Sequence, residues 1–245
     1  MSVFTKVSDA NLMAFTSNGR NLDLISRKQE ILDKISLFHN LAPSRILFVG
    51  FSSFLFAKFE DTISITNIST EVQAYLKSHN IKFKYIPETD LSKYYKKFQV
   101  VVAVDEYFTY AKTDQDQKDS VAEICNLATD YVITTLRDYK NQDYKDREFS
   151  QPIAVKNNQS SVVFLESHSW DIADRASWAS DIYGINQTTH DLTVFGKFDR
   201  RTMYFKQLAN FSATAGAASF LVHKDLMYKG LTKKNYEHVI TIKFD

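Results

Sequence analysis

Glycine and proline are scarce in this chain, and the scarcity of glycine excludes the commonest nucleotide-binding loops. The 245 residues include six glycines and three prolines. Dinucleotide-binding loops need the pattern G-x-G-x-x-G and P-loops need G-x-x-x-x-G-K-[ST], because glycine lets backbone N–H groups approach phosphate. The next glycine after Gly50 is Gly184, and neither pattern occurs. The sequence therefore disfavours NAD, FAD and P-loop nucleotides as ligands.

Cysteine and long apolar runs are scarce as well. The single Cys125 can form neither an internal disulfide nor a thiolate cluster, which excludes disulfide-stapled secreted folds and zinc fingers. The longest apolar run, Val100 to Val104, is far shorter than the roughly 20 residues that cross a bilayer, and residues 1–20 lack the apolar core of a signal peptide. We expect a cytoplasmic protein with no membrane partner.

Net charge is also low. Thirty Lys and Arg residues face 29 Asp and Glu residues, a formal charge of +1, which argues against a polyanion binder. Residues 197–206 and 224–236 interleave basic and aromatic side chains, a pattern found in grooves for single-stranded nucleic acid. A solvated surface is the commoner explanation, so nucleic acid is a possible but not a favoured partner. The patterns of Ser hydrolases (G-x-S-x-G) and zinc proteases (H-E-x-x-H) are absent.

Apolar segments alternate with helical ones through the first half of the chain. Five runs have the character of buried strands: residues 45–50, 62–66, 81–86, 99–104 and 131–136. Residues 71–78 and 116–128 have helical spacing, as does an apolar stripe between Leu24 and Phe38. This alternation predicts an α/β fold: a Rossmann-like, doubly wound, mainly parallel sheet.

Beyond residue 137 the pattern changes. A polar stretch over 138–151 is followed by shorter strand-like segments at 161–167, 180–186 and 192–198, a helical segment at 201–218 and a last strand at 237–244. Antiparallel pairing is the simplest arrangement for these strands. We find no linker, so we predict one domain over 1–245, with an N-terminal helical segment (1–40), a parallel core (45–137) and an antiparallel C-terminal part (138–245).

Ligands of open parallel sheets bind beyond the carboxyl ends of the strands, so the residues after each strand are the first candidates for a site. Here these residues are Gly50-Phe51-Ser52, Asn67, Asp90 and Asp105-Glu106. Together with a leading helix, this order of elements resembles the S-adenosylmethionine-dependent methyltransferase superfamily over roughly residues 20–140. The sequence departs from that family in lacking the second and third loop glycines and in having Asn67 where an acidic residue usually holds the ribose.

The resemblance implies S-adenosylmethionine as cofactor and gives each of these positions a role. Gly50, Phe51 and Ser52 would lie near its methionine moiety and Asn67 at its ribose, with Asp90 and Asp105 completing the cofactor-binding set. Asp105, Glu106 and Tyr107 would lie beside the transferred methyl group and form the catalytic set. The methyl acceptor is unknown. Because two usual cofactor determinants are missing, the alternative is a catalytically inactive binding or assembly protein on the same fold, such as a viral structural or accessory factor.

The segment from Asp105 to Tyr110 is a candidate site independently of this resemblance, because of the chemistry of its side chains. Two adjacent carboxylates and three aromatic residues follow the most apolar predicted strand, an arrangement that is costly to bury unless it lines a pocket. A carboxylate there can act as a base, and Tyr107 and Tyr110 can flank a sulfonium by cation–π contact. The alternative is structural: the acids cap a helix and the aromatic rings cover the sheet.

A second cluster, residues 166–175, contains Glu166, His168, Asp171 and Asp174. These side chains can bind a metal, but His168, Asp171 and Asp174 share one face only if the stretch is helical. A polar surface loop is the favoured interpretation, with Asp171 or Asp174 as a helix N-cap and both Trp170 and Trp178 packing beside that residue. We therefore predict no metal site.

The amino-acid composition indicates an AT-rich genome. Phe, Tyr, Ile, Asn and Lys, whose codons are AT-rich, are abundant. In texture the sequence resembles methyltransferase-like proteins of marine tailed phages, in which case it would act in the host cytoplasm.

Overall fold

The computed structural model describes residues 45–50, 62–78, 80–104, 106–140, 147–149, 152–156, 161–171, 173, 175–229 and 236–245. The N-terminal helical segment (1–40), the connection that contains Phe51 and Ser52, and the single residues Asp105 and Asp174 lie outside these ranges.

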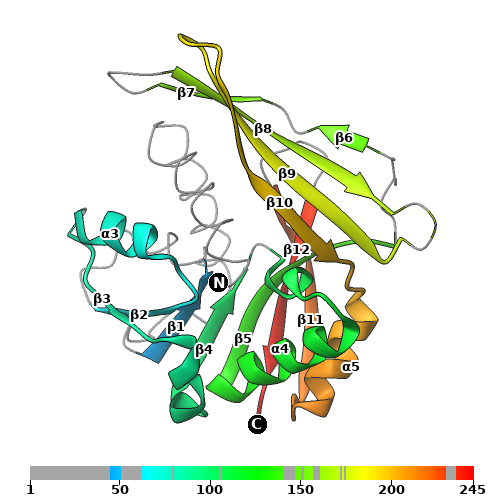
Figure 1. Ribbon diagram of the computed structural model, residues 1–245. Coiled ribbons are helices and arrows are strands. Elements are labelled where there is room, and N and C mark those ends of the chain that lie inside the picture. The colour runs from blue at the N-terminus through cyan, green and yellow to red at the C-terminus, as the bar shows by residue number, and fades with distance from the viewer. Residues whose placement is uncertain are drawn as a thin grey trace.

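A seven-stranded mixed sheet forms the centre of the molecule, in the order β11-β12-β5-β4-β1-β2-β3 (Figure 1). The first five strands in sequence are parallel, whereas β12 pairs antiparallel with both β5 and β11. Their bounds are β1 Ile46–Val49, β2 Ile63–Thr66, β3 Phe83–Tyr85, β4 Phe98–Ala103, β5 Ala128–Arg137, β11 Ser219–Lys229 and β12 Tyr236–Lys243.

The central strands β1 and β4 carry apolar side chains on both faces, because helices cover both faces of the sheet. Leu47 and Val101 pair in register and belong to the same apolar cluster as Val121 of helix α4 (Asp114–Leu127). Their neighbours Phe48 and Val102 point to the opposite face and cluster with Val72 of helix α3 (Thr70–Ser78). Alternation along each strand thus produces a three-layer α/β/α arrangement.

Helix α4 begins at a capping box. The Thr113 side chain accepts a hydrogen bond from the Asp116 backbone N–H, and the Asp116 carboxylate accepts one from the Thr113 N–H, both at 3.0 Å. Helix α5 (Phe205–Thr214) packs beside α4, where Gln207 donates a hydrogen bond to the Gln117 side chain at 3.3 Å (Figure 1).

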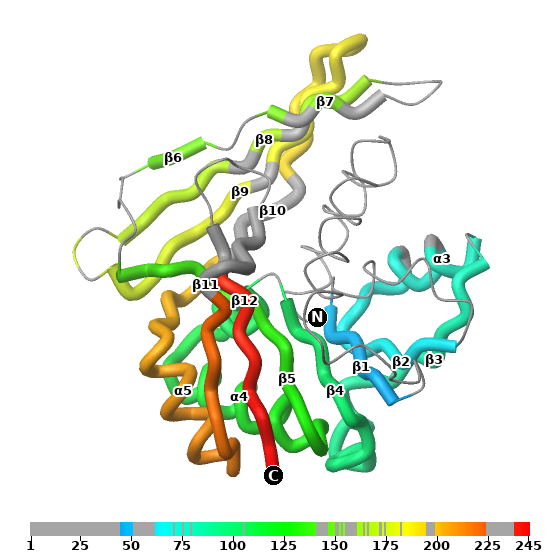
Figure 2. Tube along the Cα trace, turned by 180° about the vertical axis from the view of Figure 1, so that it is seen from behind, coloured from blue at the N-terminus to red at the C-terminus, as the bar shows by residue number. Residues whose placement is uncertain are grey.

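A second, antiparallel sheet is inserted between β5 and α5. It has the order β10-β9-β8-β6, with β7 also paired to β8, and it lies beyond the carboxyl ends of β4 and β5 (Figures 1 and 2). Its strands are β6 Arg147–Phe149, β7 Ile153–Lys156, β8 Ser161–Trp170, β9 Ser177–Asn186 and β10 Leu192–Arg201. The two sheets meet at the edge where a doubly wound fold binds its ligand.

The structure confirms the predicted α/β fold, the five parallel strands and antiparallel pairing after residue 137. The predicted helix over 201–218 is too long, since Arg201 still pairs with Ser177 in the β10–β9 ladder. At the other end of α5, Gly216 has a positive φ of 88°, and β11 follows. The short strands β6 and β7 and the long strand β11 were not expected.

Candidate functional site

The strand order reverses between β1 and β4, and in open α/β sheets the carboxyl ends of the strands at such a point form the ligand-binding crevice. Gly50 ends β1 there with a φ of 64°, a conformation that favours glycine. A Cβ atom placed on Gly50 would lie 3.7 Å from the Asn67 carbonyl oxygen and 3.9 Å from the Tyr107 ring. Segments that follow three different strands, β1, β2 and β4, therefore converge at Gly50.

The end of β2 presents polar atoms without partners. Asn67 is buried in the left-handed region (φ 56°), and its Nδ2 donates a hydrogen bond to the Tyr107 hydroxyl at 2.5 Å. Its Oδ1 and the neighbouring Thr66 Oγ1 are buried and have no hydrogen-bond partner among the described residues. Leaving such a group unpaired costs about 1–3 kcal/mol. A ligand with hydroxyl donors would satisfy Asn67 Oδ1 at this position.

Tyr107 forms the third side of the crevice. It opens the short 3-10 helix η5 (Tyr107–Tyr110), is buried, and stands edge-on to Phe108 with 5.5 Å between ring centroids. Burial, followed by the negative charges of Glu123 and Glu88, raises the pKa of Tyr107 far above its ordinary value of 10. The phenol therefore stays protonated, so it can shape the crevice and hydrogen-bond but cannot serve as a base near neutral pH.

Glu106 is engaged by basic and phenolic partners. Its Oε2 lies 3.0 Å from Arg137 Nη2 and 3.8 Å from Arg200 Nη1, and its Oε1 accepts a hydrogen bond from the Tyr139 hydroxyl at 2.6 Å. The side chain is 1% exposed, and its φ of 54° is held in part by a hydrogen bond from its N–H to Thr135 Oγ1. Burial and the Glu106 charge raise the pKa of Tyr139.

The same cluster ties the second sheet to the first. The Arg200 guanidinium of β10 lies 4.1 Å from the Tyr110 ring centroid and 4.7 Å from that of Trp178. Arg137 of β5 lies 5.2 Å from the Trp178 ring. Such contacts stabilise buried cations by about 0.5–2 kcal/mol each. These contacts favour Glu106 as an anchor between the sheets, whereas its predicted catalytic role stays a prediction.

The predicted site residues thus fall into three groups. Gly50, Asn67 and Tyr107 meet in the crevice, with Glu106 directly before Tyr107. Asp90 lies instead in the surface 3-10 helix η4 (Glu88–Tyr94), where its Oδ1 pairs with Lys93 Nζ at 2.6 Å. Phe51, Ser52 and Asp105 lie outside the described residues.

Sequence reasoning missed several residues of this region. Glu88 follows β3 as Asp90 does, and its charge acts on Tyr107 and on Glu123, whose pKa is raised by burial and by Glu88. The same rule of strand ends identifies Arg137, the last residue of β5. Arg200 falls in the basic, aromatic-rich segment 197–206, but nothing in the sequence marks it as a partner of Glu106, because Glu106 lies far away along the chain.

The residues proposed as a possible metal cluster are arranged differently from a helix. His168 is in strand β8, pairs with Ser180 across the ladder and stands edge-on to Trp178 with 5.0 Å between centroids. Asp171 opens a turn in which its carboxylate accepts a hydrogen bond from the Ala173 N–H, so the expected helix N-cap is wrong. Among the described residues no three acidic, His or Cys side chains gather as metal ligands; Asp174 is not described. The Trp170 and Trp178 rings stack on each other, with 4.9 Å between their centroids.

The basic segments are only partly surface features. Arg200 is largely covered and lies against aromatic rings, and Arg201 Nε donates a hydrogen bond to Asp114 Oδ1 at 2.5 Å. Lys206 is exposed on α5. The side chains of residues 224–235 lie outside the described part, so contact of these segments with nucleic acid stays a prediction. No helix within the described ranges has the length and apolar character needed to cross a membrane.

Comparisons with known proteins identify the fold. DesVI from Streptomyces venezuelae superposes with a TM-score of 0.69 at 14% identity, over 93% of this chain and 94% of that one. The sugar N-methyltransferase KedS8 of a Streptoalloteichus species gives 0.66 at 11% identity (90% and 87% covered). The amino pentose methyltransferase CalS10 from Micromonospora echinaspora, with S-adenosylmethionine bound, gives 0.63 at 11% identity (89% and 91%). No family model matches the sequence, and neither does any curated protein.

The likeness includes the second sheet. In the match to DesVI, 7% of this chain, about 17 of its 245 residues, is not covered, whereas the inserted region 138–201 has 64 residues. The match therefore extends into the inserted sheet as well as over the parallel core. The chain has the Rossmann-like fold of S-adenosylmethionine-dependent methyltransferases, including an insertion over the carboxyl edge.

Proposed function

We propose that this chain binds S-adenosylmethionine at the carboxyl ends of β1, β2 and β4 and catalyses methyl transfer to an acceptor held beneath the second sheet. The observation that carries the proposal is the unpartnered Asn67 Oδ1, buried at the end of β2 next to Gly50 and Tyr107. A ribose hydroxyl is a donor of the kind this oxygen lacks. The fold neighbours support the choice of cofactor.

Each residue at the carboxyl ends of these strands would have a separate role in binding. Gly50 leaves the crevice open where β1 ends, Asn67 would accept a hydrogen bond from the ribose, and the neutral Tyr107 would form a wall. The cofactor supplies an activated methyl group on a sulfonium. The chain then has to exclude water and hold the acceptor in line, which requires positioning more than a strong base. Asp105 stays our candidate for steering the acceptor.

The second sheet lies over the carboxyl ends of β4 and β5 (Figure 2), so it would border an acceptor bound beside the cofactor. One of the fold neighbours is named a sugar N-methyltransferase and another an amino pentose methyltransferase. We therefore place amino sugars first among the acceptors to be assayed, followed by other primary and secondary amines.

Thermal melts with and without S-adenosylmethionine or S-adenosylhomocysteine test the cofactor site. At a ligand concentration a hundredfold above the dissociation constant, the native state gains about 2.7 kcal/mol. For a chain of this size, the midpoint should rise on the order of 5–10 °C. If neither compound shifts the midpoint, the proposal is wrong and the fold serves binding or assembly alone. A shift without methyl transfer to any amine would leave a cofactor-binding, catalytically silent protein.

Two glycine variants locate the cofactor within the fold. Gly50→Ala and Gly216→Ala both place a side chain on a positive φ, so each should lose about 1–2 kcal/mol of stability. Gly50 contacts the crevice, whereas Gly216 has no atom within 4 Å of an added Cβ. Only Gly50→Ala should therefore reduce the shift that S-adenosylhomocysteine produces. An equal reduction in both variants would place the cofactor elsewhere.

A further inference from the structure

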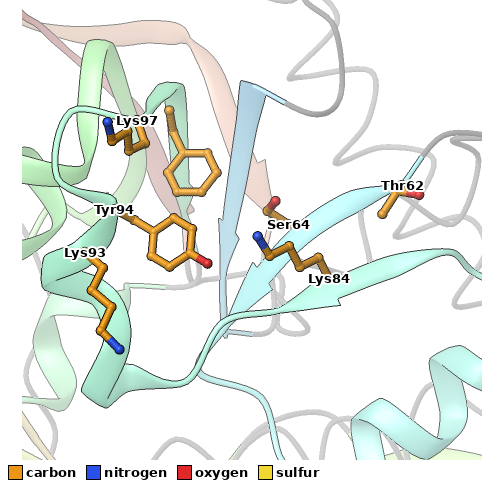
Figure 3. A pocket seen from close by; sticks show the side chains of 7 residues that line it. Thr62, Ser64, Lys84, Lys93, Tyr94 and Lys97 are labelled. Carbon is orange, nitrogen blue, oxygen red and sulfur yellow. The ribbon is translucent and has the colours of Figure 1, made fainter.

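A second pocket lies away from the crevice, toward the amino-terminal ends of the strands. Its volume is about 410 Å³, within the usual range of small-molecule sites. Ser64 of β2 and Lys84 of β3, which pair in register, form its floor, and Phe98 lies at the start of β4 (Figure 3). Gly50 and Asn67 lie at the opposite ends of β1 and β2, so the two sites are distinct.

A turn at Lys96 builds the wall of this pocket. Lys96 has a φ of 53°, and its side chain turns away to the Ala128 carbonyl oxygen, 2.9 Å from its Nζ. The chain reverses there, so that Phe98 returns against Tyr94 with ring planes 17° apart and centroids at 6.0 Å. Tyr94, the last residue of η4, and Phe98, the first residue of β4, together form an aromatic wall.

The charge around the pocket is positive. Lys84, Lys93 and Lys97 line it, and no acidic residue does. Lys93 is paired with Asp90, but no ion pair with a described residue involves Lys84 or Lys97. The Lys84 ammonium lies 5.1 Å from the Tyr94 ring centroid, pointing across the aromatic wall (Figure 3). The pocket thus combines unneutralised ammonium groups, a floor hydroxyl and a flat apolar surface.

We propose that this pocket binds a phosphate ester of nucleotide size. Its phosphoryl oxygens would accept hydrogen bonds from Lys84 and Lys97, and Ser64 would add a hydroxyl donor. Its nucleoside part would contact Tyr94, since aromatic surfaces accept bases without regard to their identity. A bare anion would use the lysines of the lining but not the Tyr94 ring. A nucleotide would use both, so the lining favours a nucleotide.

Cytidine 5′-diphosphate tests this proposal, because it lacks the adenosine moiety and does not resemble S-adenosylmethionine there. Calorimetric titration of the full chain should detect binding that weakens as salt is raised, since exposed cations are screened. Inorganic pyrophosphate should bind at least about tenfold more weakly, and cytidine without phosphates should not bind detectably. Saturation with S-adenosylhomocysteine should leave the affinity unchanged. This test is independent of the proposed methyl transfer.

A charge-matched pair of variants separates the pocket from the general field of the protein. Lys84→Ala/Lys97→Ala should weaken cytidine diphosphate about tenfold or more, because it removes two charge-assisted hydrogen bonds. Lys118→Ala/Lys206→Ala removes two exposed lysines from α4 and α5 and should have no effect. Absence of binding, equal losses in both variants, or competition by S-adenosylhomocysteine would each overturn the proposal. Pyrophosphate binding as tightly as the nucleotide would overturn its nucleotide character.

Discussion

Glu106 shows how much a single buried carboxylate determines at the junction of the two sheets. Its oxygens receive the Arg137 guanidinium and the Tyr139 hydroxyl, and a second guanidinium, that of Arg200, lies within 4 Å. Replacing a buried charge with a neutral group leaves its partners desolvated and unpaired, which costs more than the pair itself contributes. Glu106 should therefore be a strong determinant of stability whatever its part in chemistry.

We predict that Glu106→Gln lowers the free energy of unfolding by about 3 kcal/mol, the lower end of the range for breaking a buried ion pair. Urea denaturation followed by far-UV circular dichroism measures the loss. Asp119→Asn is the matched control, because Asp119 is exposed on α4 and bonds only Gln115 within the described residues. Its effect should stay within about 0.5 kcal/mol. An unchanged stability with lost methyl transfer would instead make Glu106 a catalytic residue.

The sequence allowed the convergence of Gly50, Asn67 and Tyr107 to be predicted, because Gly50 and Asn67 directly follow β1 and β2 and Tyr107 comes shortly after β4. Parallel strands bring their carboxyl ends to one edge, so local spacing is sufficient for these three residues. The partners of Glu106 were not predictable in this way. Arg137 is 31 residues away, and Arg200 belongs to a different sheet whose docking depends on tertiary packing.

A surface ion pair between Asp114 of α4 and Arg201 of β10 joins these two elements. The hydrogen bond from Arg201 Nε lowers the pKa of Asp114 below its ordinary value of 3.8, and the nearby positive charge adds to this effect. A lowered pKa in the folded state means that the pair stabilises the fold above pH 3.8. That contribution is lost as the pH falls through the folded pKa. Because Asp114 is largely exposed, solvent screens the pair and its contribution is small.

We expect Asp114→Asn to be less stable than the wild type by under about 1 kcal/mol near neutral pH. The difference should disappear in acid, below the folded pKa, where the carboxylate is protonated in both states. Urea midpoints measured between pH 2.5 and 7 test this expectation, with Asp119→Asn as the control. A difference that is constant across this range would show that the side chain acts through packing rather than charge.

The elements that the sequence predicted best are those with one dominant signal. β4 contains the apolar run from Val100 to Ala103, β5 is buried from Val132 to Arg137, and α4 has an apolar stripe. β11 was missed because it is an edge strand of the central sheet, with Leu221 exposed, so its periodicity is weak. The helix over 201–218 was drawn too long since apolar residues of β10 and α5 follow each other without a break that periodicity can detect.

For the molecule as a whole, the two sheets share one apolar core. Trp170 and Trp178 of the second sheet belong to the same buried cluster as Val101, Val132 and residues of α4. The Tyr139 ring packs edge-on against Trp170 at 6.0 Å, and Gln117 of α4 donates to the carbonyl oxygen of Thr202 at 3.3 Å. Each sheet thus covers apolar surface that the other would expose. The inserted sheet should not be stable as a separate unit.

The second sheet and the central sheet each contain buried side chains whose exposure can be followed separately during unfolding. Its two tryptophans, Trp170 and Trp178, lie in the second sheet, and its one cysteine, Cys125, is buried on α4 against the central sheet. Burial raises the pKa of the Cys125 thiol to about 12, so the folded protein should not react with a thiol reagent near neutral pH.

We predict that tryptophan fluorescence and Cys125 reactivity change at the same urea concentration, because the shared core makes unfolding cooperative. Far-UV circular dichroism should give the same midpoint. A tryptophan transition at lower urea, with Cys125 still protected, would show that the second sheet unfolds on its own. In that case the Glu106 cluster would stabilise only the docked second sheet, and Glu106→Gln should lower only the tryptophan midpoint. If the transitions coincide, Glu106→Gln should lower both midpoints together. Losing the Glu106 charge would then destabilise one cooperative unit that contains both sheets.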